Sequence, residues 1–176
     1  MRLGALLMLA LPLPATAQDL PPAYPVEALE TCLLQKPDVE AEHCIGIAAG
    51  DCIYSGQMGS NAGMGACLAA ELSQWDARLN DAYQALLSHE RADDVAAEGP
   101  WPDKAPALQQ MQRAWMGYRD ATCDYAQSLW GGGTGGPLAA TECRLDLTAR
   151  QAILLGQRLE DTKEGAYIAR PSVLWR

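Results

Sequence analysis

The stretch CLAAELSQWDARLNDAYQALLSHE, residues 67–90, decides the fold because its apolar side chains follow a helical repeat. They recur in alternating steps of three and four positions, at Leu68, Leu72, Trp75, Leu79, Ala82 and Leu86. Steps of this size place side chains on one face of an α-helix. The stretch therefore predicts a long amphipathic helix that continues to about residue 92.

A second long helix is predicted after a break that contains Gly99, Pro100 and Pro102. Asp103 suits the N-cap of this helix, and Pro106 is tolerated in a first helical turn. The alternation of three and four positions then returns at Leu108, Met111, Trp115, Tyr118, Thr122, Tyr125 and Leu129.

The glycine-rich run at residues 131–136 ends the second helix and separates it from a third. Pro137 suits the first turn of that third helix. Its apolar positions are Cys143, Leu145, Leu147, Ile153, Leu154 and Leu159. Two breaks between three long helices imply that neighbouring helices run antiparallel.

The segment before the first long helix contains shorter helical turns. Residues 26–35 and 40–49 carry apolar side chains at helical spacing, with Pro37 and Gly50 as breaks. Residues 54–65 include four glycines and are predicted to form a loop.

The first residues have the layout of a secretory signal peptide. Arg2 precedes the apolar run at residues 3–11, and the small residues Ala15, Thr16 and Ala17 precede a predicted cleavage before Gln18. The apolar run is much shorter than the roughly 20 residues of a membrane-spanning helix. We therefore expect a periplasmic or secreted protein with no membrane span. No cysteine lies near the cleavage site, so we also expect no lipid anchor.

An exported chain meets oxidising conditions, which favour disulfides. The six cysteines are Cys32, Cys44, Cys52, Cys67, Cys123 and Cys143. Six cysteines allow roughly fifteen connectivities, and the sequence does not choose among them. We favour the bonding of neighbours along the chain, because each bond would then join adjacent elements. Zinc and redox sites commonly use a Cys-x-x-Cys pair, which this chain lacks, so we expect no metal and no cofactor.

Together these patterns predict an all-α fold, a small disulfide-stapled bundle of three long antiparallel helices with short N-terminal helices. We expect a signal peptide at residues 1–17, a cysteine-containing helical extension at 18–66, the helical domain at 67–160 and a C-terminal tail at 161–176. Apolar residues of the tail could dock on the bundle.

The net charge narrows the possible partners. The 176-residue chain has 22 acidic and 13 basic side chains, a formal net charge of -9. Binding to a phosphate backbone needs clustered lysine and arginine, so no nucleic-acid partner is expected. Basic proteins are the partners that this charge favours.

Several polar residues interrupt or flank the apolar faces. Arg150 falls at an apolar position of the third helix, where a guanidinium needs a carboxylate partner. We hypothesise an inter-helix network in which Arg119 and Arg150 meet Glu71 or Asp76, with Gln112 beside the second stripe. Structural bracing is the favoured role of such a network, because buried ion pairs mostly fix register.

No catalytic group is predicted. Glu71 and Asp76 lie five positions apart and point to different sides of one helix, unlike the paired carboxylates of a glycosidase. His43 and His89 lie in no nucleophile motif. The glycine run at 131–136 lacks the lysine of a phosphate-binding loop and is interpreted as a flexible connector or a projecting tip.

The motif residues resemble those of the lysozyme-inhibitor LprI-like N-terminal domain family. The resemblance covers residues 67–155 and rests on Glu71, Leu72, Trp75, Asp76, Leu79, Asn80, Tyr83, Gln112, Arg113, Ala114, Trp115, Tyr118, Arg119, Asp120, Ala121, Cys123, the glycine run, Cys143, Thr148 and Arg150. It implies a small secreted helical domain with a Cys123–Cys143 disulfide around the glycine loop. It also implies inhibition of lysozyme-type muramidases.

The resemblance and the charge lead to one functional expectation. A lysozyme-type enzyme is commonly basic, so an acidic exported protein has the complementary charge. The loops at 54–65 and 130–136 each lie beside a cysteine, and either could occlude an enzyme cleft. The alternative is a non-catalytic binding or scaffold module of the cell envelope, because a fold does not fix a function.

Overall fold

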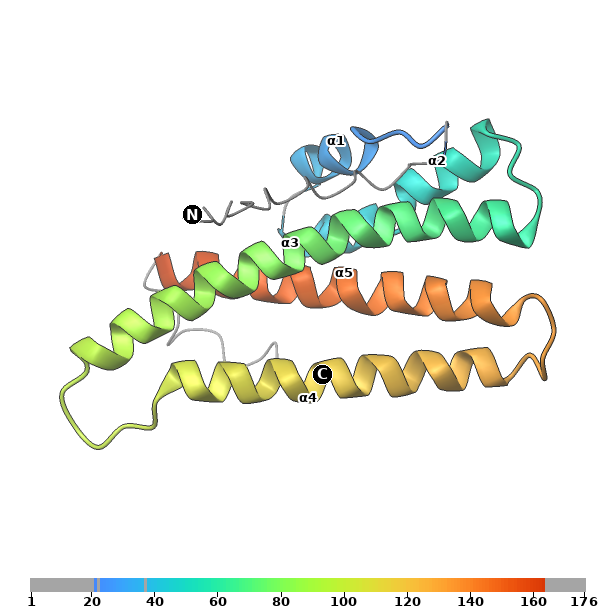
Figure 1. Cartoon of the computed structure of the whole chain (residues 1–176). Coiled ribbons are helices and arrows are strands. Elements are labelled where there is room, and N and C mark those ends of the chain that lie inside the picture. Colours follow the sequence, from blue (N-terminus) through green and yellow to red (C-terminus); the bar gives the residue numbers. More distant parts are fainter. Residues whose placement is uncertain (1–20, 22, 37, 164–176) are drawn as a thin grey trace, which may run out of the picture.

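The computed structural model describes residues 21, 23–36 and 38–163 (Figure 1). The predicted signal peptide and the tail beyond Lys163 lie outside the described residues. Within them the chain forms helices and no strands, which confirms the predicted all-α fold. The helices are α1 (Ala28–Gln35), the 3-10 helix η1 (Asp38–Cys44), α2 (Ile47–Ser55), α3 (Asn61–Ala96), α4 (Lys104–Ser128) and α5 (Gly136–Lys163).

Consecutive long helices run antiparallel, so α3 and α5 point the same way, and α5 lies between α3 and α4 (Figure 1). The most extensive helix contact joins α3 and α5, and the next joins α4 and α5. Helix α2 packs on α3, and α1 packs on α2 and η1, on the side of the bundle away from α4 (Figure 1). The core therefore centres on α3 and α5, where Trp75, Leu79 and Leu155 are buried.

The structure corrects the predicted boundaries of the N-terminal elements. The helix expected at 40–49 is divided at Gly46, whose φ of 85° is a left-handed conformation that favours glycine. Gly50, the predicted break, lies inside α2. The loop expected at 54–65 is shorter, because Ser60 caps α3 by accepting a hydrogen bond from the Gly63 amide at 3.0 Å.

Three disulfides join consecutive elements, which is the favoured bonding of neighbours. Cys32–Cys44 links α1 to η1, Cys52–Cys67 links α2 to α3, and Cys123–Cys143 links α4 to α5. The Cα–Cα distances run from 5.4 to 5.8 Å, within the usual range for the bond. These links support the predicted disulfide-stapled bundle.

The N-terminus of α4 is capped from the preceding helix. Asp103 occupies the expected N-cap position, but its side chain makes no capping hydrogen bond. Instead Asp94, in the last turn of α3, accepts from the Lys104 amide at 2.8 Å and the Ala105 amide at 2.9 Å. A carboxylate is unfavourable at the end of its own helix and favourable at the start of the next. Asp94 therefore fixes the turn between α3 and α4.

No helix in the described part of the chain combines the length and the apolar character that crossing a membrane requires.

Candidate functional site

The two loops that the sequence marks as candidate binding loops meet at one end of the bundle. The α2–α3 loop and the α4–α5 loop lie side by side there (Figure 1), and the Asn61 side-chain amide donates a hydrogen bond to the Thr134 hydroxyl at 3.1 Å. We call residues 54–61 and 129–136 together the loop end. It brings two segments that are far apart in sequence into one surface.

The glycine run is a series of hydrogen-bonded turns. The amides of Gly131, Gly133 and Gly136 each donate to the carbonyl three residues earlier, at 2.8 to 3.2 Å. Gly131 and Gly132 have φ values of 55° and 86°, a conformation that favours glycine. The run is therefore a projecting tip with defined backbone geometry, which agrees with one of the two interpretations made from the sequence.

Trp130 is the largest side chain on this tip. A Cβ atom on Gly135 would lie 2.3 Å from the Trp130 ring, so the ring rests directly on the Gly135 backbone. The side chain nevertheless stays 55% exposed. The indole therefore packs against the Gly135 backbone while more than half of the residue stays exposed.

Other exposed apolar groups lie at the loop end, and a cavity lined by acidic groups adjoins Tyr54. Tyr54, at the end of α2, is 86% exposed, and Leu129 is also exposed. A cavity of about 380 Å³ between α2, α3 and α5 is lined by Tyr54 and by the carboxylates Glu142 and Asp146. The loop end thus combines exposed aromatic groups with nearby negative charge.

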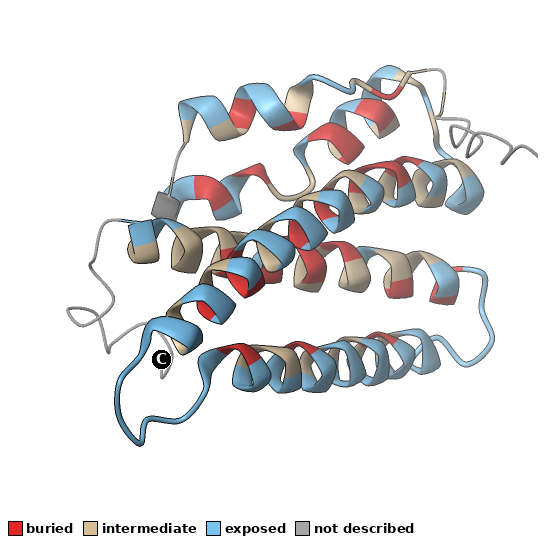
Figure 2. Ribbon diagram, turned by 60° about the vertical axis from the view of Figure 1, so that its left-hand side comes forward, coloured by how far each residue is buried: buried red, intermediate tan, exposed pale blue. Residues whose placement is uncertain are grey.

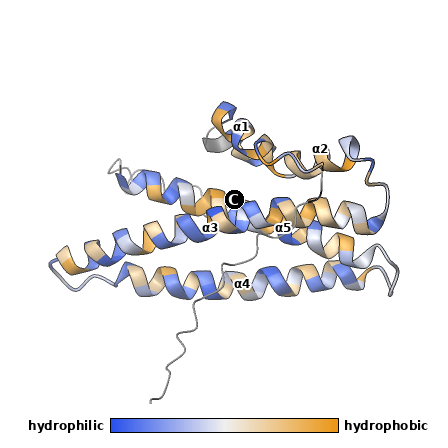
Figure 3. Cartoon of the chain, turned by 45° about the horizontal axis from the view of Figure 1, so that its top comes forward, coloured by the Kyte–Doolittle hydropathy of each residue, from blue (hydrophilic) through white to orange (hydrophobic). Residues whose placement is uncertain are grey.

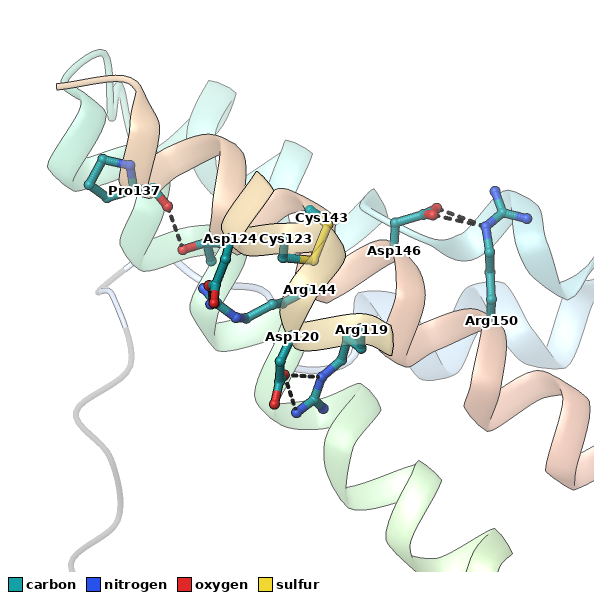
Figure 4. Close-up of a disulfide and its surroundings, with 10 residues drawn as sticks. Arg119, Asp120, Cys123, Asp124, Pro137, Cys143, Arg144, Asp146 and Arg150 are labelled. Atoms are coloured by element: carbon teal, nitrogen blue, oxygen red, sulfur yellow. Dashed lines mark hydrogen bonds and ion pairs between the residues drawn. A yellow bond between two sulfur atoms is a disulfide. The ribbon is translucent and has the colours of Figure 1, made fainter. Parts of the chain in front are cut away.

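The base of the tip is held by the Cys123–Cys143 disulfide (Figure 4). On the same two helices the Asp124 carboxylate and the Arg144 guanidinium form an ion pair at 2.8 Å. The Thr141 hydroxyl donates to the Pro137 carbonyl at 2.9 Å, inside the first turns of α5. The helices on both sides of the glycine run are therefore cross-linked covalently and electrostatically.

Glu71, predicted to meet an arginine, has a different environment. Its side chain is fully buried, and its carboxylate accepts from the amides of Gly46 and Ala49 at 2.7 Å each. The Trp75 indole donates to the same carboxylate at 3.0 Å. These amides belong to the start of α2, where the helix dipole favours a negative charge. The N-terminus of α2 thus takes the place of the predicted arginine.

A buried tyrosine lies near this carboxylate. The Tyr24 hydroxyl donates to the Gln74 side chain at 2.6 Å, and Gln74 donates in turn to the Val26 carbonyl at 2.9 Å. Burial, and then the negative charge of Glu71, raise the pKa of Tyr24 above its usual value. The hydroxyl therefore remains protonated and ties the chain before α1 to α3.

The prediction that Arg119 and Arg150 bind Glu71 or Asp76 is corrected by the structure. The Arg119 guanidinium contacts Asp120 at 2.9 Å and stacks 5.1 Å from the centre of the Trp115 ring. Asp76 accepts instead from the Asn80 side-chain amide at 3.1 Å.

Arg150 was expected on the buried face of the third helix, but its side chain is 48% exposed. It contacts Asp146 at 2.9 Å and also pairs with Glu42 of η1. These two carboxylates, Asp146 first, raise the pKa of Arg150. The buried face of α5 is formed by Leu145, Thr148, Ala149, Ala152 and Leu155, and residue 150 points away from it.

We expect Arg150→Ala to lower the free energy of unfolding by no more than about 1 kcal/mol, because exposed ion pairs contribute little. Chemical denaturation at low and high salt measures this effect, and salt should reduce it further. A loss of several kcal/mol that salt leaves unchanged would show that the guanidinium is buried after all.

The remaining motif residues divide between core and surface. Gln112 is buried and accepts from the Gln151 side-chain amide at 3.0 Å, a contact between α4 and α5 that the sequence did not indicate. Tyr83 and Trp115 are partly buried against the core. Tyr118 is 59% exposed on the outer side of α4.

A second polar cluster lies at the opposite end of the bundle. His89, Glu90 and Asp93 bring three possible metal-ligand atoms within 4.8 Å of one another. The Lys104 ammonium approaches Asp93 at 2.8 Å and Glu90 at 3.4 Å. The hydrogen bond between Lys104 and Asp93 lowers the pKa of Asp93 and raises that of Lys104. A lysine already supplies positive charge here, so we assign the cluster to the α3–α4 turn.

Comparison with known proteins connects these residues to a family. An uncharacterised protein of Rhizobium meliloti (strain 1021) is 30% identical over 91 residues, which cover 50% of this chain and 66% of that protein. The chain thus spans slightly less than two thirds of this relative. No solved structure matches this chain. The family described as lysozyme inhibitor LprI matches residues 52–155, which include α3, α4, most of α5 and the loop end. The chain belongs to the lysozyme inhibitor LprI family.

Proposed function

We propose that the chain binds a basic lysozyme-type muramidase and occludes its substrate cleft with the loop end. The observation that carries the proposal is Trp130, an exposed indole held on the Gly135 backbone at the tip of a loop with a disulfide at its base. A pre-organised side chain loses little conformational entropy on binding. Such a tip suits insertion into a cleft.

Charge and compartment support the same partner. The acidic chain would be steered toward a basic enzyme, and the Glu142 carboxylate lines the same cavity as Tyr54 of the loop end. Three disulfides fit an oxidising compartment such as the periplasm or the extracellular space, where cell-wall hydrolases work. We also propose that the chain is exported through a signal peptide that is cleaved near Ala17. In this proposed role the chain inhibits the muramidase and performs no catalysis itself.

We expect Trp130→Ala to weaken inhibition by about 30-fold or more, because buried tryptophans are frequent hot spots of protein interfaces. The assay titrates the purified chain into a cell-wall lysis reaction with several lysozyme types. Trp101→Ala is the matched control, since Trp101 is 71% exposed in the loop between α3 and α4, at the other end of the bundle. The control should inhibit as the parent does.

The same titration tests the charge argument. Raising the salt concentration should weaken inhibition, because screening shortens the range of the attraction. If a several-fold molar excess inhibits no lysozyme type, the proposal fails. The alternative of a non-catalytic envelope binding module would then be favoured, and pull-down from envelope extract would test it.

A further inference from the structure

The outer side of α4 has a regular uncharged row. The row contains Ala107, Met111, Ala114, Tyr118, Ala121 and Tyr125, and all six side chains are exposed. Their spacing alternates between four and three positions, which is the heptad pattern of the seam between two helices of a coiled coil. We call these six residues the α4 seam.

No described element of the chain packs on the α4 seam. The buried residues of α4 are Ala105, Gln112 and Cys123, which face α3 and α5. In Figure 2 the buried colour follows one side of α4 and leaves its outer side exposed. Figure 3 shows hydrophobic residues recurring along the same helix. A surface helix of a monomer ordinarily carries polar residues on its outer side.

We propose that the α4 seam binds the α4 seam of a second copy of this chain, with the two helices antiparallel. Large and small residues alternate strictly along the seam, so reversing one copy sets each large residue against an alanine. Met111 then faces Ala121 of the second copy, Tyr118 faces its Ala114, and Tyr125 faces its Ala107. A parallel pair would set tyrosine against tyrosine and alanine against alanine, which packs poorly.

The residues beside the seam are compatible with this arrangement. In an antiparallel pair each edge of the seam meets the same edge of the other copy. One edge contains Gln110, Gly117 and Asp124, and the other contains Leu108, Trp115 and Thr122. On the first edge Gly117 lies at the two-fold axis, where a small residue allows close approach, and Gln110 faces Asp124. No pair of like charges meets across the seam.

The expected area indicates a weak dimer. A seam about 27 Å long on helices about 10 Å wide covers roughly 270 Å² of each helix, so the interface is smaller than the roughly 1,200 Å² at which specific, stable interfaces begin. We therefore expect a dissociation constant in the micromolar range. The proposal does not depend on the proposed function, because the dimer forms without a muramidase.

Analytical ultracentrifugation of the purified chain from about 1 to 200 µM measures the dimer directly. The parent should shift from monomer to dimer across this range. Tyr118→Glu, which places a charge in the seam, should raise the dissociation constant by about a hundredfold. Tyr54→Glu changes another exposed tyrosine, outside the seam, and should leave dimerisation unchanged. Thermal unfolding checks that both variants remain folded.

A residue swap tests the matching of large and small residues across the seam. Ala114→Tyr alone sets tyrosine against tyrosine, and Tyr118→Ala alone sets alanine against alanine, so each should weaken the dimer about tenfold. The double variant again sets one tyrosine against one alanine in each pair and should return to within about threefold of the parent. A parent that stays monomeric at the highest concentration overturns the proposal. Dimerisation only after removal of residues 164–176 would also overturn the proposal, because the tail would then be what covers the α4 seam in the full chain.

Discussion

Replacing Glu71 with alanine should lower the free energy of unfolding by about 4 kcal/mol. The variant leaves the amides of Gly46 and Ala49 and the Trp75 indole without their acceptor in the core. It also removes the negative charge that the start of α2 favours. Thermal unfolding should show a decrease in Tm of about 10 °C.

Two further variants test whether the expected loss comes from the capping role of Glu71. Glu71→Gln keeps the side-chain volume but turns one acceptor into a donor that faces a backbone amide, so we expect a loss of about 2–3 kcal/mol. Asp76→Ala is the matched control, because Asp76 is an exposed carboxylate on the same helix with a hydrogen bond to Asn80. Its effect should stay within about 0.5 kcal/mol. Equal effects at positions 71 and 76 would refute the capping role of Glu71.

Removing the Cys123–Cys143 disulfide by a double substitution to alanine should lower the free energy of unfolding by about 3 kcal/mol. The bond spans 20 residues, and breaking it releases the unfolded chain from a loop constraint. It also frees the base of the glycine tip, so inhibition in the lysis assay should fall more than stability alone explains. Chemical denaturation and lysozyme titration, each at a temperature where the variant stays folded, separate the two effects.

The Cys32–Cys44 bond provides the control for this experiment. It spans 12 residues between α1 and η1, which lie before the residues matched to the family. Its removal should reduce stability by a similar amount, about 3 kcal/mol, because loop entropy changes slowly with length. Inhibition should be retained. If both double variants inhibit equally well, the disulfide does not position the tip.

The long helices were predictable because their apolar residues recur over many turns, as Leu72, Trp75 and Leu79 show for α3. The disulfide pairing was predictable as a preference, since bonds between neighbouring cysteines join consecutive helices. Both patterns depend on local sequence. The exposed or buried state of a given position within a stripe depends on where the other helices pack.

That dependence explains the errors at the site. Arg150 lies at an apolar step in the periodic pattern, yet α5 buries Ala149 and Ala152 and leaves residue 150 half-exposed. Periodicity also gave no sign that Glu71 would cap α2 or that Asp94 would cap α4, because caps from another helix are tertiary contacts. The helix break at Gly46 was not predictable either. It depends on the positive φ of this residue, which a glycine permits but does not require.

The buried carboxylate of Glu71 also limits how far the N-terminus can be shortened in a domain that folds on its own. Glu71 lies within the residues matched to the family, 52–155, but both of its backbone donors precede Cys52. A chain trimmed to the matched residues would retain a carboxylate in its interior and lose the amides that solvate it. The smallest autonomous domain therefore extends at least to Gly46. A shorter relative with a glutamate here must supply another set of donors or expose that side chain to water.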